Sequence, residues 1–326
     1  MDGVTDAAFR YMVSKYSHPS VVMTEFTNVE GLARGAVQML VAFLYNEIER
    51  PVVAQIYGVE VDSYYKSSVM LCAMGFDGID INMGCPANKV AKRGSGAGLI
   101  RTPALAKQII RSCKKAVSDW NNGVSMEDAG VHEEIIKAVR EMGPEGERRM
   151  IPVSVKTRIG FDEVVAEEWT KHLLEELPAN ITMHGRTLKQ MYLGRADWEV
   201  IGKAARVCDG SGVSFLGNGD VESMEDAALK AKTYGLDGVL VGRAALGRPW
   251  FFGGEEPDSE EGIMRILLEH CRYFVELDHL YFYNIKKHLA WYCKGFEGAK
   301  EMRMKLMRAG SLEDVEEILN DKHGKA

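Results

Sequence analysis

The sequence predicts a (β/α)8 TIM barrel, with a truncated first strand, followed by a small all-α helical bundle. Short apolar runs rich in β-branched residues alternate with helical periods, which is typical of successive βα units. The chain has 326 residues, of which 46% are hydrophobic, so it can bury one barrel-sized core and a second, smaller one. Beyond residue 261 every strong hydrophobic period is helical.

Seven segments are predicted to be strands buried on both faces of a parallel sheet, because each is short and almost continuously apolar. They lie at 21–24, 52–57, 78–82, 152–158, 180–184, 213–217 and 238–242. Helical periods separate them at 62–74, 103–117, 164–177, 198–207 and 223–234. Seven strands are one fewer than a complete barrel requires.

The missing strand belongs at the start of the chain. Residues 1–6 lead directly into a predicted helix at 7–15, so the sequence begins where the tip of a first strand is expected. Either the start is truncated or the barrel has a gap. A gap would leave two strand edges unpaired, which favours aggregation.

The barrel is expected at 1–252, with a polar surface insertion at 119–150 that carries a helix at 126–142. The acidic stretch at 253–261 is predicted to be a linker. The helical domain then occupies 262–326, with helices at 262–277, 281–293, 297–309 and 311–319. Ser311 and Asp314 form a capping-box-like start for the last helix.

Composition restricts the setting of the protein. No apolar run approaches the roughly 20 residues that span a bilayer, and the N-terminus lacks the sections of a secretory signal. We therefore expect a soluble, cytoplasmic protein without membrane contact or a stable protein partner. The six cysteines form no C-x-x-C pair, so we expect reduced thiols and neither a disulfide framework nor a metal site.

The net charge of −7 argues weakly against nucleic acid, but the charge is unevenly distributed. Residues 81–118 contain eight Lys or Arg and no acidic residue. Residues 286–308 contain seven basic residues against Glu297 and Glu301. Such clusters are typical of nucleic-acid contact surfaces, although a solvated helix face has the same composition.

Barrel active sites lie at the C-terminal ends of the strands. The polar or flexible residues at these ends are Gln55, Asn82, Cys85, Lys156, Arg158, His184, Arg186, Asn218, Gly219, Asp220, Gly242 and Arg243. Glycines after the last two strands let backbone N–H groups approach an anion where such barrels usually bind phosphate. We therefore expect a phosphate-bearing cofactor held partly by Lys156 and His184; ordinary tight turns, a solvated Lys and a structural His are the alternatives.

Cys85 is the candidate reactive side chain. It lies between a glycine and a proline, where a strand ends, and Lys89, Lys92 and Arg93 follow it in a basic glycine-rich loop. Neighbouring cations lower the pKa of a thiol. A buried apolar cysteine is the simpler alternative. The residues alone leave open whether the thiol is a nucleophile or a general acid.

Stretches along nearly the whole chain match one known family. They are 1–6, 54–58, 80–99, 155–160, 184–187, 217–221 and 242–250, with Lys287-His288 and Trp291-Tyr292 in the helical part. At these residues the sequence resembles the tRNA-dihydrouridine synthase family, and within it the bacterial B-type branch. The Asn-x-Gly-Cys-Pro motif at 82–86, followed by the basic glycine loop, is the most specific of them.

The resemblance implies an FMN-containing barrel joined to a helical tRNA-binding domain, which uses NADPH to reduce the C5–C6 double bond of specific uridines in tRNA. It implies that FMN is bound by Met1, Gly3, Gln55, Lys156, His184, Asn218, Gly219, Asp220, Gly242 and Arg243. Contacts to the tRNA substrate are then expected from Asn82, Arg158, Arg186, Lys89, Lys92 and Arg93. By the same resemblance, Asn82 orients the uracil, and Cys85 is the general acid that protonates C5 while hydride reaches C6.

Two other functions are compatible with the residues. One is another FMN barrel oxidoreductase that acts on a free pyrimidine. The other is a catalytically impaired tRNA-binding or folding factor. The sequence departs from the family in its absent first strand and in its segment 119–150, which is longer than the usual connection.

Overall fold

The computed structural model describes residues 1–277 and 281–323, apart from the side chains of Asn88, Lys89, Lys322 and His323. The chain divides into two compact units. Unit 1 consists of Met1–Glu25, Leu44–Arg50 and Gly242–Ala326, and unit 2 consists of Phe26–Phe43 and Pro51–Val241. Among the described residues, no helix combines the length and the apolar character needed to cross a bilayer.

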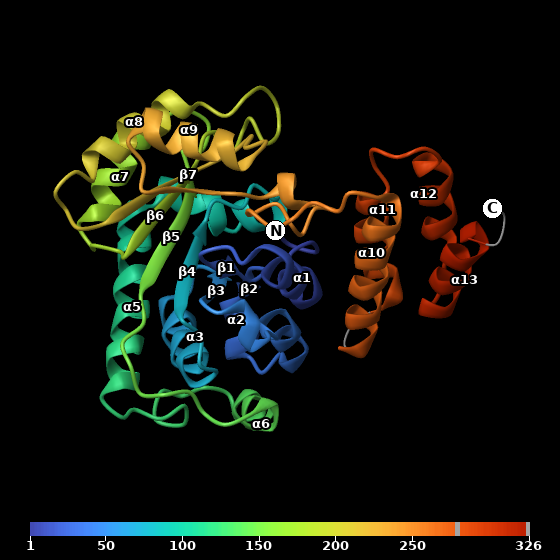
Figure 1. Ribbon diagram of the computed structural model, residues 1–326. Helices are drawn as coiled ribbons and strands as arrows, with labels where there is room; N and C mark the ends of the chain where they lie inside the picture. Colours follow the sequence, from blue (N-terminus) through green and yellow to red (C-terminus); the bar gives the residue numbers. More distant parts are fainter. Residues whose placement is uncertain (278–280, 324–326) are drawn as a thin grey trace. The chain divides into compact units, whose positions relative to one another are not determined.

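Unit 2 is built on an all-parallel sheet of the TIM-barrel type (Figure 1). Its strands are β2 (Thr27–Asn28), β3 (Val52–Tyr57), β4 (Gly78–Met83), β5 (Val153–Arg158), β6 (Asn180–His184), β7 (Ser214–Asn218) and β8 (Gly238–Leu240). Each strand pairs in parallel with the next strand along the chain. Sequential parallel pairing with helical crossovers is the arrangement of a β/α barrel, so the predicted fold class is confirmed.

Helices of unit 2 form a layer outside this sheet (Figure 1). The layer contains α2 (Val29–Ala33), α3 (Val61–Ala73), α5 (Pro103–Asn121), α7 (Ala166–Leu174), α8 (Trp198–Val207) and α9 (Met224–Tyr234). Each of them contacts the next in this order. The layer is tied to the sheet by Trp169 of α7, whose Nε1 donates a hydrogen bond of 2.9 Å to Thr157 Oγ1 of β5.

Shorter elements fill the connections of unit 2. They are η1 (Val37–Phe43), α4 (Asn88–Ala91), η3 (Gly96–Arg101) and α6 (Glu133–Met142). α6 confirms that the segment 119–150 carries a helix, but the helix starts at residue 133 rather than 126. Residues 125–130 instead form a turn, in which the Ser125 hydroxyl accepts a hydrogen bond from Asp128 N. The turn ends at Gly130, whose φ of +72° interrupts helical backbone, so α6 begins only after it.

The strand register brings the predicted polar residues to one end of the sheet. Directly paired positions are Gln55 with Asp80, Asn82 with Lys156, Arg158 with His184, and His184 with Asn218. Because the strands are parallel, their carboxyl ends form a single edge. The site described below lies at this edge.

Unit 1 is mainly helical. It contains α1 (Ala7–Ser17), β1 (Val22–Met23), η2 (Glu47–Glu49), η4 (Arg243–Ala245), α10 (Glu260–Glu276), η5 (Phe282–Asn284), α11 (Lys286–Tyr292), α12 (Ala299–Arg308) and α13 (Leu312–His323). The residues 1–6 contain no strand, as predicted, and α1 follows them directly. The helices predicted beyond residue 261 are confirmed, with the second of them divided into η5 and α11.

The first helix shares a hydrophobic core with the C-terminal helices. Ala8 and Met12 of α1 belong to the same buried cluster as Leu267, Phe274 and Leu306. The compact units therefore do not follow the predicted boundary at residue 252. The assignment of a catalytic barrel and a tRNA-binding helical domain to particular ranges stays a prediction.

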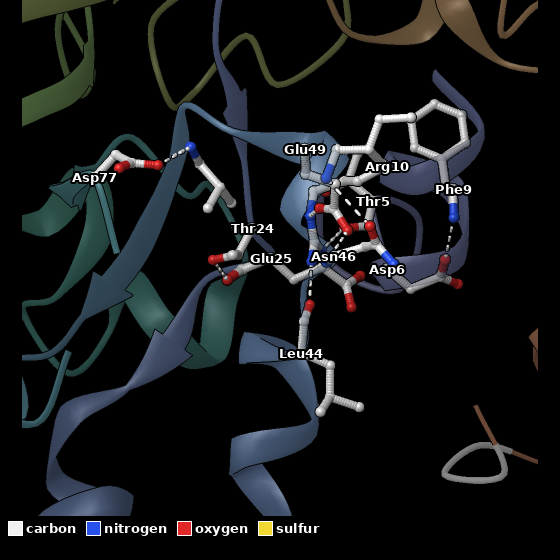
Figure 2. A network of polar contacts seen from close by, with 12 residues as sticks. Thr5, Asp6, Phe9, Arg10, Thr24, Glu25, Leu44, Asn46, Glu49 and Asp77 are labelled. Atoms are coloured by element: carbon white, nitrogen blue, oxygen red, sulfur yellow. Dashed lines mark hydrogen bonds and ion pairs between the residues drawn. The ribbon is translucent and has the colours of Figure 1, made fainter. Parts of the chain in front are cut away.

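A buried ion pair fixes the segment 44–50 to α1 within unit 1 (Figure 2). Arg10 Nε lies 2.8 Å from Glu49 Oε2, and both side chains are almost completely buried. The Arg10 guanidinium also donates to the carbonyl oxygens of Thr5 and Leu44. The other oxygen of Glu49 accepts from Asn46 N at 2.9 Å. All three guanidinium nitrogens of Arg10 and both carboxylate oxygens of Glu49 thus form hydrogen bonds, as a buried ion pair requires.

Candidate active site

The strand β4 ends in a tight turn that holds Cys85. Asn82 Oδ1 accepts hydrogen bonds from Gly84 N at 3.1 Å and from Cys85 N at 2.9 Å. An asparagine is suited to this position because its side chain replaces a backbone acceptor in such turns. Both Asn82 and Cys85 are buried. The thiol is therefore placed at the carboxyl end of the sheet, as the sequence predicts.

The glycine-rich loop packs closely around this turn. Gly96 has φ +57°, and a Cβ at this residue would lie only 3.0 Å from Cys85 O and 3.1 Å from Cys85 Cβ. Ala97 N donates a hydrogen bond of 3.2 Å to Cys85 O. A residue with a side chain at position 96 would push Cys85 out of place. Close packing against Cys85 therefore explains why a glycine stands at position 96.

A chain of hydrogen bonds runs beneath the turn. Ser154 Oγ donates to Asp80 Oδ1 at 2.7 Å, and Gln55 Nε2 donates to Asp80 Oδ2 at 2.8 Å. Asn82 Nδ2 in turn donates to Gln55 Oε1 at 2.9 Å. Asp80 is completely buried. Burial raises the pKa of its carboxyl to about 6, although the bonds from Ser154 and Gln55 and the charge of Lys156 oppose the rise.

Two cations of β5 belong to the same cluster. Burial lowers the pKa of Lys156 to about 8; the charge of Arg158 adds to this effect, while Asp80 and Cys85 oppose it. Burial likewise lowers the pKa of Arg158 to about 10. Both groups are thus cations at neutral pH, and they lie close enough to Cys85 to interact with it electrostatically.

Arg158 holds two loops at the edge of the sheet. Its Nε donates to Gly84 O at 2.7 Å, and its Nη1 donates to Thr187 O at 3.1 Å and to Met191 O at 3.4 Å. The first bond fixes the turn before Cys85. The other bonds fix the loop that follows β6. Arg158 therefore positions backbone, and its predicted contact with the substrate stays a prediction.

His184 and Arg186 contribute buried polar atoms to the site. Burial lowers the pKa of His184 to about 2, and the charges of Lys156, Arg158 and Arg186 act in the same direction. The imidazole is therefore neutral. Arg186 Nη2 donates to Asp220 Oδ2 at 2.5 Å and to Gly194 O at 2.8 Å. Among the residues that the structure describes, His184 Nδ1 and Arg186 Nε and Nη1 are buried without a hydrogen-bond partner.

The turn after β7 has a constrained backbone. Gly219 has φ +123°, and a Cβ there would lie 2.7 Å from the Cβ of Ala196 and 3.3 Å from His184 Nε2. Asp220 adopts φ 50° although it is not a glycine. Asn218 Nδ2 donates to Leu240 O at 2.7 Å, which ties β7 to β8. Backbone conformations of this kind are concentrated at ligand sites.

The structure does not bring all the predicted site residues into one unit. Met1, Gly3, Gly242 and Arg243 belong to unit 1. Within it, a Cβ on Gly242 would lie 3.4 Å from Met1 Sδ, so these two residues are neighbours. Lys92 and Arg93 are exposed in unit 2. The side chain of Lys89 lies outside the described residues.

Two polar residues of the site were not predicted from the sequence. Asp80 lies within the apolar run of β4, and Ser154 lies on β5 beside it. A carboxylate in the middle of a buried strand is rare unless it has partners. That signal is present in the sequence, but it does not identify which side chains are the partners.

The chain is similar to known proteins over nearly its whole length. A sequence model of the family described as “Dihydrouridine synthase (Dus)” matches residues 1–127 and 123–325. A “Probable tRNA-dihydrouridine synthase” of Staphylococcus aureus (strain COL) is 33% identical over 333 residues, which cover 98% of this chain and 90% of the relative. “Probable tRNA-dihydrouridine synthase 2” of Bacillus subtilis (strain 168) is 32% identical, with coverage of 98% and 91%.

Among solved structures, a DHODH from Eimeria tenella in complex with ferulenol matches with a TM-score of 0.43 and 14% sequence identity. The match covers 74% of this chain and 64% of that protein.

Proposed function

Because the chain belongs to the dihydrouridine synthase family, we propose that it is a flavin-dependent tRNA-dihydrouridine synthase. It reduces the C5–C6 double bond of specific uridines in tRNA, with FMN as the bound cofactor and NADPH as the reductant. The observation that carries the proposal is the buried Cys85 turn beside the cations Lys156 and Arg158 at the carboxyl edge of the sheet. A reduction that adds a proton and a hydride to a ring needs a donor and positive charge at one place.

The residues at the edge of the sheet fit a flavin. His184 Nδ1 and two guanidinium nitrogens of Arg186 are buried polar atoms without a partner among the described residues, and buried polar groups are normally satisfied. Lys156 supplies a positive charge, and Gly219 lets the turn after β7 pack closely against Ala196 and His184. In this proposal Gln55, Lys156 and His184 would hold the cofactor, as the resemblance implies. Arg186, which the resemblance assigns to the substrate, would hold the cofactor as well. When bound, FMN supplies the hydride for C6 of the uracil.

The side chains of the site divide the remaining work. Asn82 holds the uracil, and Cys85 Sγ donates the proton that C5 receives. Lys156 and Arg158 stabilise the negative charge that develops on the ring as hydride arrives. The target base must leave its stack to reach this buried site, as bases do in other enzymes that act on nucleic acid.

Exposed basic residues provide the electrostatic part of tRNA binding. In unit 2 these are Lys92 and Arg93 of the loop after Cys85. In unit 1 they are Lys294, Lys300, Arg303, Lys305 and Arg308. Phosphate contacts of such residues supply affinity without sequence preference. We place the enzyme in the cytoplasm, because its substrate is tRNA.

The purified protein is expected to be yellow with flavin absorbance, to oxidise NADPH, and to form dihydrouridine on unmodified tRNA. Cys85→Ala is expected to abolish product while flavin stays bound. Cys113→Ala is the matched control, because Cys113 is a buried thiol of α5 that the mechanism does not use. A colourless protein that is inert on tRNA would contradict the function, and an active Cys85→Ala variant would contradict the role of the thiol.

A further inference from the structure

The hydrogen-bond chain beneath Cys85 has fixed ends. At one end stands the Asp80 carboxylate, which when ionised accepts hydrogen bonds and donates none. At the other end stand the backbone N–H groups of Gly84 and Cys85, which can only donate. Gln55 and Asn82 lie between these ends and are linked by a hydrogen bond of 2.9 Å.

Only one orientation of the two amides satisfies both ends. Asp80 requires the NH2 group of Gln55, so that the Gln55 oxygen is directed to Asn82. The N–H groups of the turn require the oxygen of Asn82, so that the Asn82 NH2 group is directed to Gln55. The observed bonds follow this order throughout. Turning either amide over would oppose two donors or two acceptors in a buried place, at a cost of about 1–3 kcal/mol per unmade bond.

We propose that Asp80 is a positioning residue that fixes the orientation of both site amides through Gln55, so that Asn82 directs its oxygen to the Cys85 turn and presents its NH2 group to a ligand with a ring carbonyl oxygen. Ser154 supports this role, because its hydroxyl bonds the second carboxylate oxygen and holds the plane of the carboxylate. The residues that carry the inference lie on the adjacent strands β3, β4 and β5, so the frame is rigid.

The chemistry that such a frame selects is specific. An NH2 group donates to the carbonyl oxygen of a uracil or of a flavin, and it opposes the amino group of a cytosine where it faces position 4 of the ring. A site built to bond one partner rejects the analogue that lacks it, because its buried polar groups are left unpaired. The assignment of uracil as the ligand of Asn82 rests on the proposed function; the orientation of the amides does not.

A nuclear magnetic resonance titration tests the orientation without any activity. In 15N-labelled protein, the side-chain NH2 signals of Gln55 and Asn82 are expected to shift together as Asp80 titrates near pH 6. In Asp80→Asn both responses are expected to vanish. In Gln55→Leu the response of Asn82 is expected to vanish, because the link between Asp80 and Asn82 is removed. Asp77→Asn is the matched control, since this carboxylate precedes the other end of β4 and bonds Val52 N and Arg149.

The other titratable groups near Asp80 change their charge outside the pH range of the measurement. Lys156, Arg158 and His184 face the same cluster, but their pKa values of about 8, 10 and 2 leave their charge nearly constant between about pH 4.5 and 7. The measurement is repeated in Cys85→Ala to remove the thiol. An Asn82 side-chain NH2 chemical shift that does not change as Asp80 is protonated would overturn the proposal.

Steady-state kinetics of uridine reduction provide a second test of the positioning role. Asp80→Leu removes the acceptor and is expected to lower kcat/KM for uridine reduction by about tenfold or more. Asp80→Asn keeps an oxygen for Gln55, so it is expected to retain activity within about threefold of the wild type. Because Asp80 raises the pKa of Lys156, the alkaline limb of the pH profile is expected to move to lower pH in Asp80→Asn.

The outcomes are distinguishable from a failure of the proposed function. A wild type that forms no dihydrouridine would refute the function, while the titration still tests the orientation of the amides. If Asp80→Leu does not fold, Asp80→Asn and the titration decide. Equal kcat/KM in Asp80→Leu, with an unchanged pH profile in Asp80→Asn, would refute the positioning role.

Discussion

Replacing Asp80 by Asn is expected to stabilise the folded protein at neutral pH. The side chain is completely buried, and burial raises the pKa of the carboxyl from 3.8 to about 6. Its contribution to stability is therefore fully present below the unfolded pKa and is lost as the pH rises through about 6. A shift of about 2 pKa units corresponds to a loss of about 3 kcal/mol at higher pH. Asn resembles the protonated acid and has no proton to lose, so the variant avoids this loss.

Part of the gain is offset, because the nearby charge of Asp80 stabilises the Lys156 cation. We therefore expect Asp80→Asn to raise the free energy of unfolding by about 1–3 kcal/mol at about pH 8, and to change it little at about pH 4. Urea unfolding at both pH values measures this, with hydrogen exchange of the β4 amides to confirm that the change is local. A variant that is equally stable or less stable at about pH 8 would refute the reasoning.

Three further predictions concern other parts of the molecule. Arg10→Met is expected to lower the free energy of unfolding by about 3–5 kcal/mol, because it leaves Glu49 as a buried charge without its partner. The double variant with Glu49→Leu is expected to recover most of this loss. Additive losses of the two single variants in urea unfolding would contradict the prediction. Gly219→Ala is expected to lower Tm more than Gly194→Ala, since both have positive φ but only Gly219 has atoms close to a new Cβ; equal losses would contradict the steric argument. FMN affinity, measured by fluorescence, is expected to fall in the wild type as the pH rises through about 8, because Lys156 loses its charge there. In Lys156→Met the affinity is expected to stay constant over the same pH range. A fall in both proteins would assign the effect to another group.

Much of the fold follows from local patterns in the sequence. The predicted bounds of β3, β6 and α8 are those of the structure, because a buried parallel strand is a continuous apolar run and α8 is an amphipathic period with an Asp197 cap. The short elements α2, η1 and η2 were not predicted. They span few residues and contain no complete hydrophobic period, so their conformation depends on what packs around them.

The composition of the compact units was not predictable in the same way. The apolar face of α1, with Ala8 and Met12, has the same pattern whether it packs on a barrel or on a helical bundle. In the structure it packs into the cluster of α10, α11, α12 and α13. A hydrophobic period gives the side that is buried but does not name the partner. For that reason the sequence could not show that α1 shares a core with the C-terminal helices, and the predicted domain ranges stay predictions.

The sequence was sufficient to predict which residues lie at the carboxyl ends of the strands. The periodicity places Gln55, Asn82, Lys156 and His184 at one edge of the sheet, and the register confirms it. The partners of these residues depend on atomic geometry. Asp80 was part of the matched motif, yet its role follows only from two hydrogen bonds of 2.7 and 2.8 Å.

The two arginines show why a strand-end position is not sufficient to assign a role. Arg158 and Arg186 both reach the edge of the sheet, and both donate to backbone carbonyls of the loop after β6. Arg158 also bonds Gly84 O, so one side chain connects that loop with the turn that holds Cys85. A guanidinium has five donors, so these structural bonds do not exhaust it. Loss of Arg158 would therefore displace the thiol even if the arginine never contacts the substrate, and only a comparison of Cys85 reactivity with substrate KM separates the two roles.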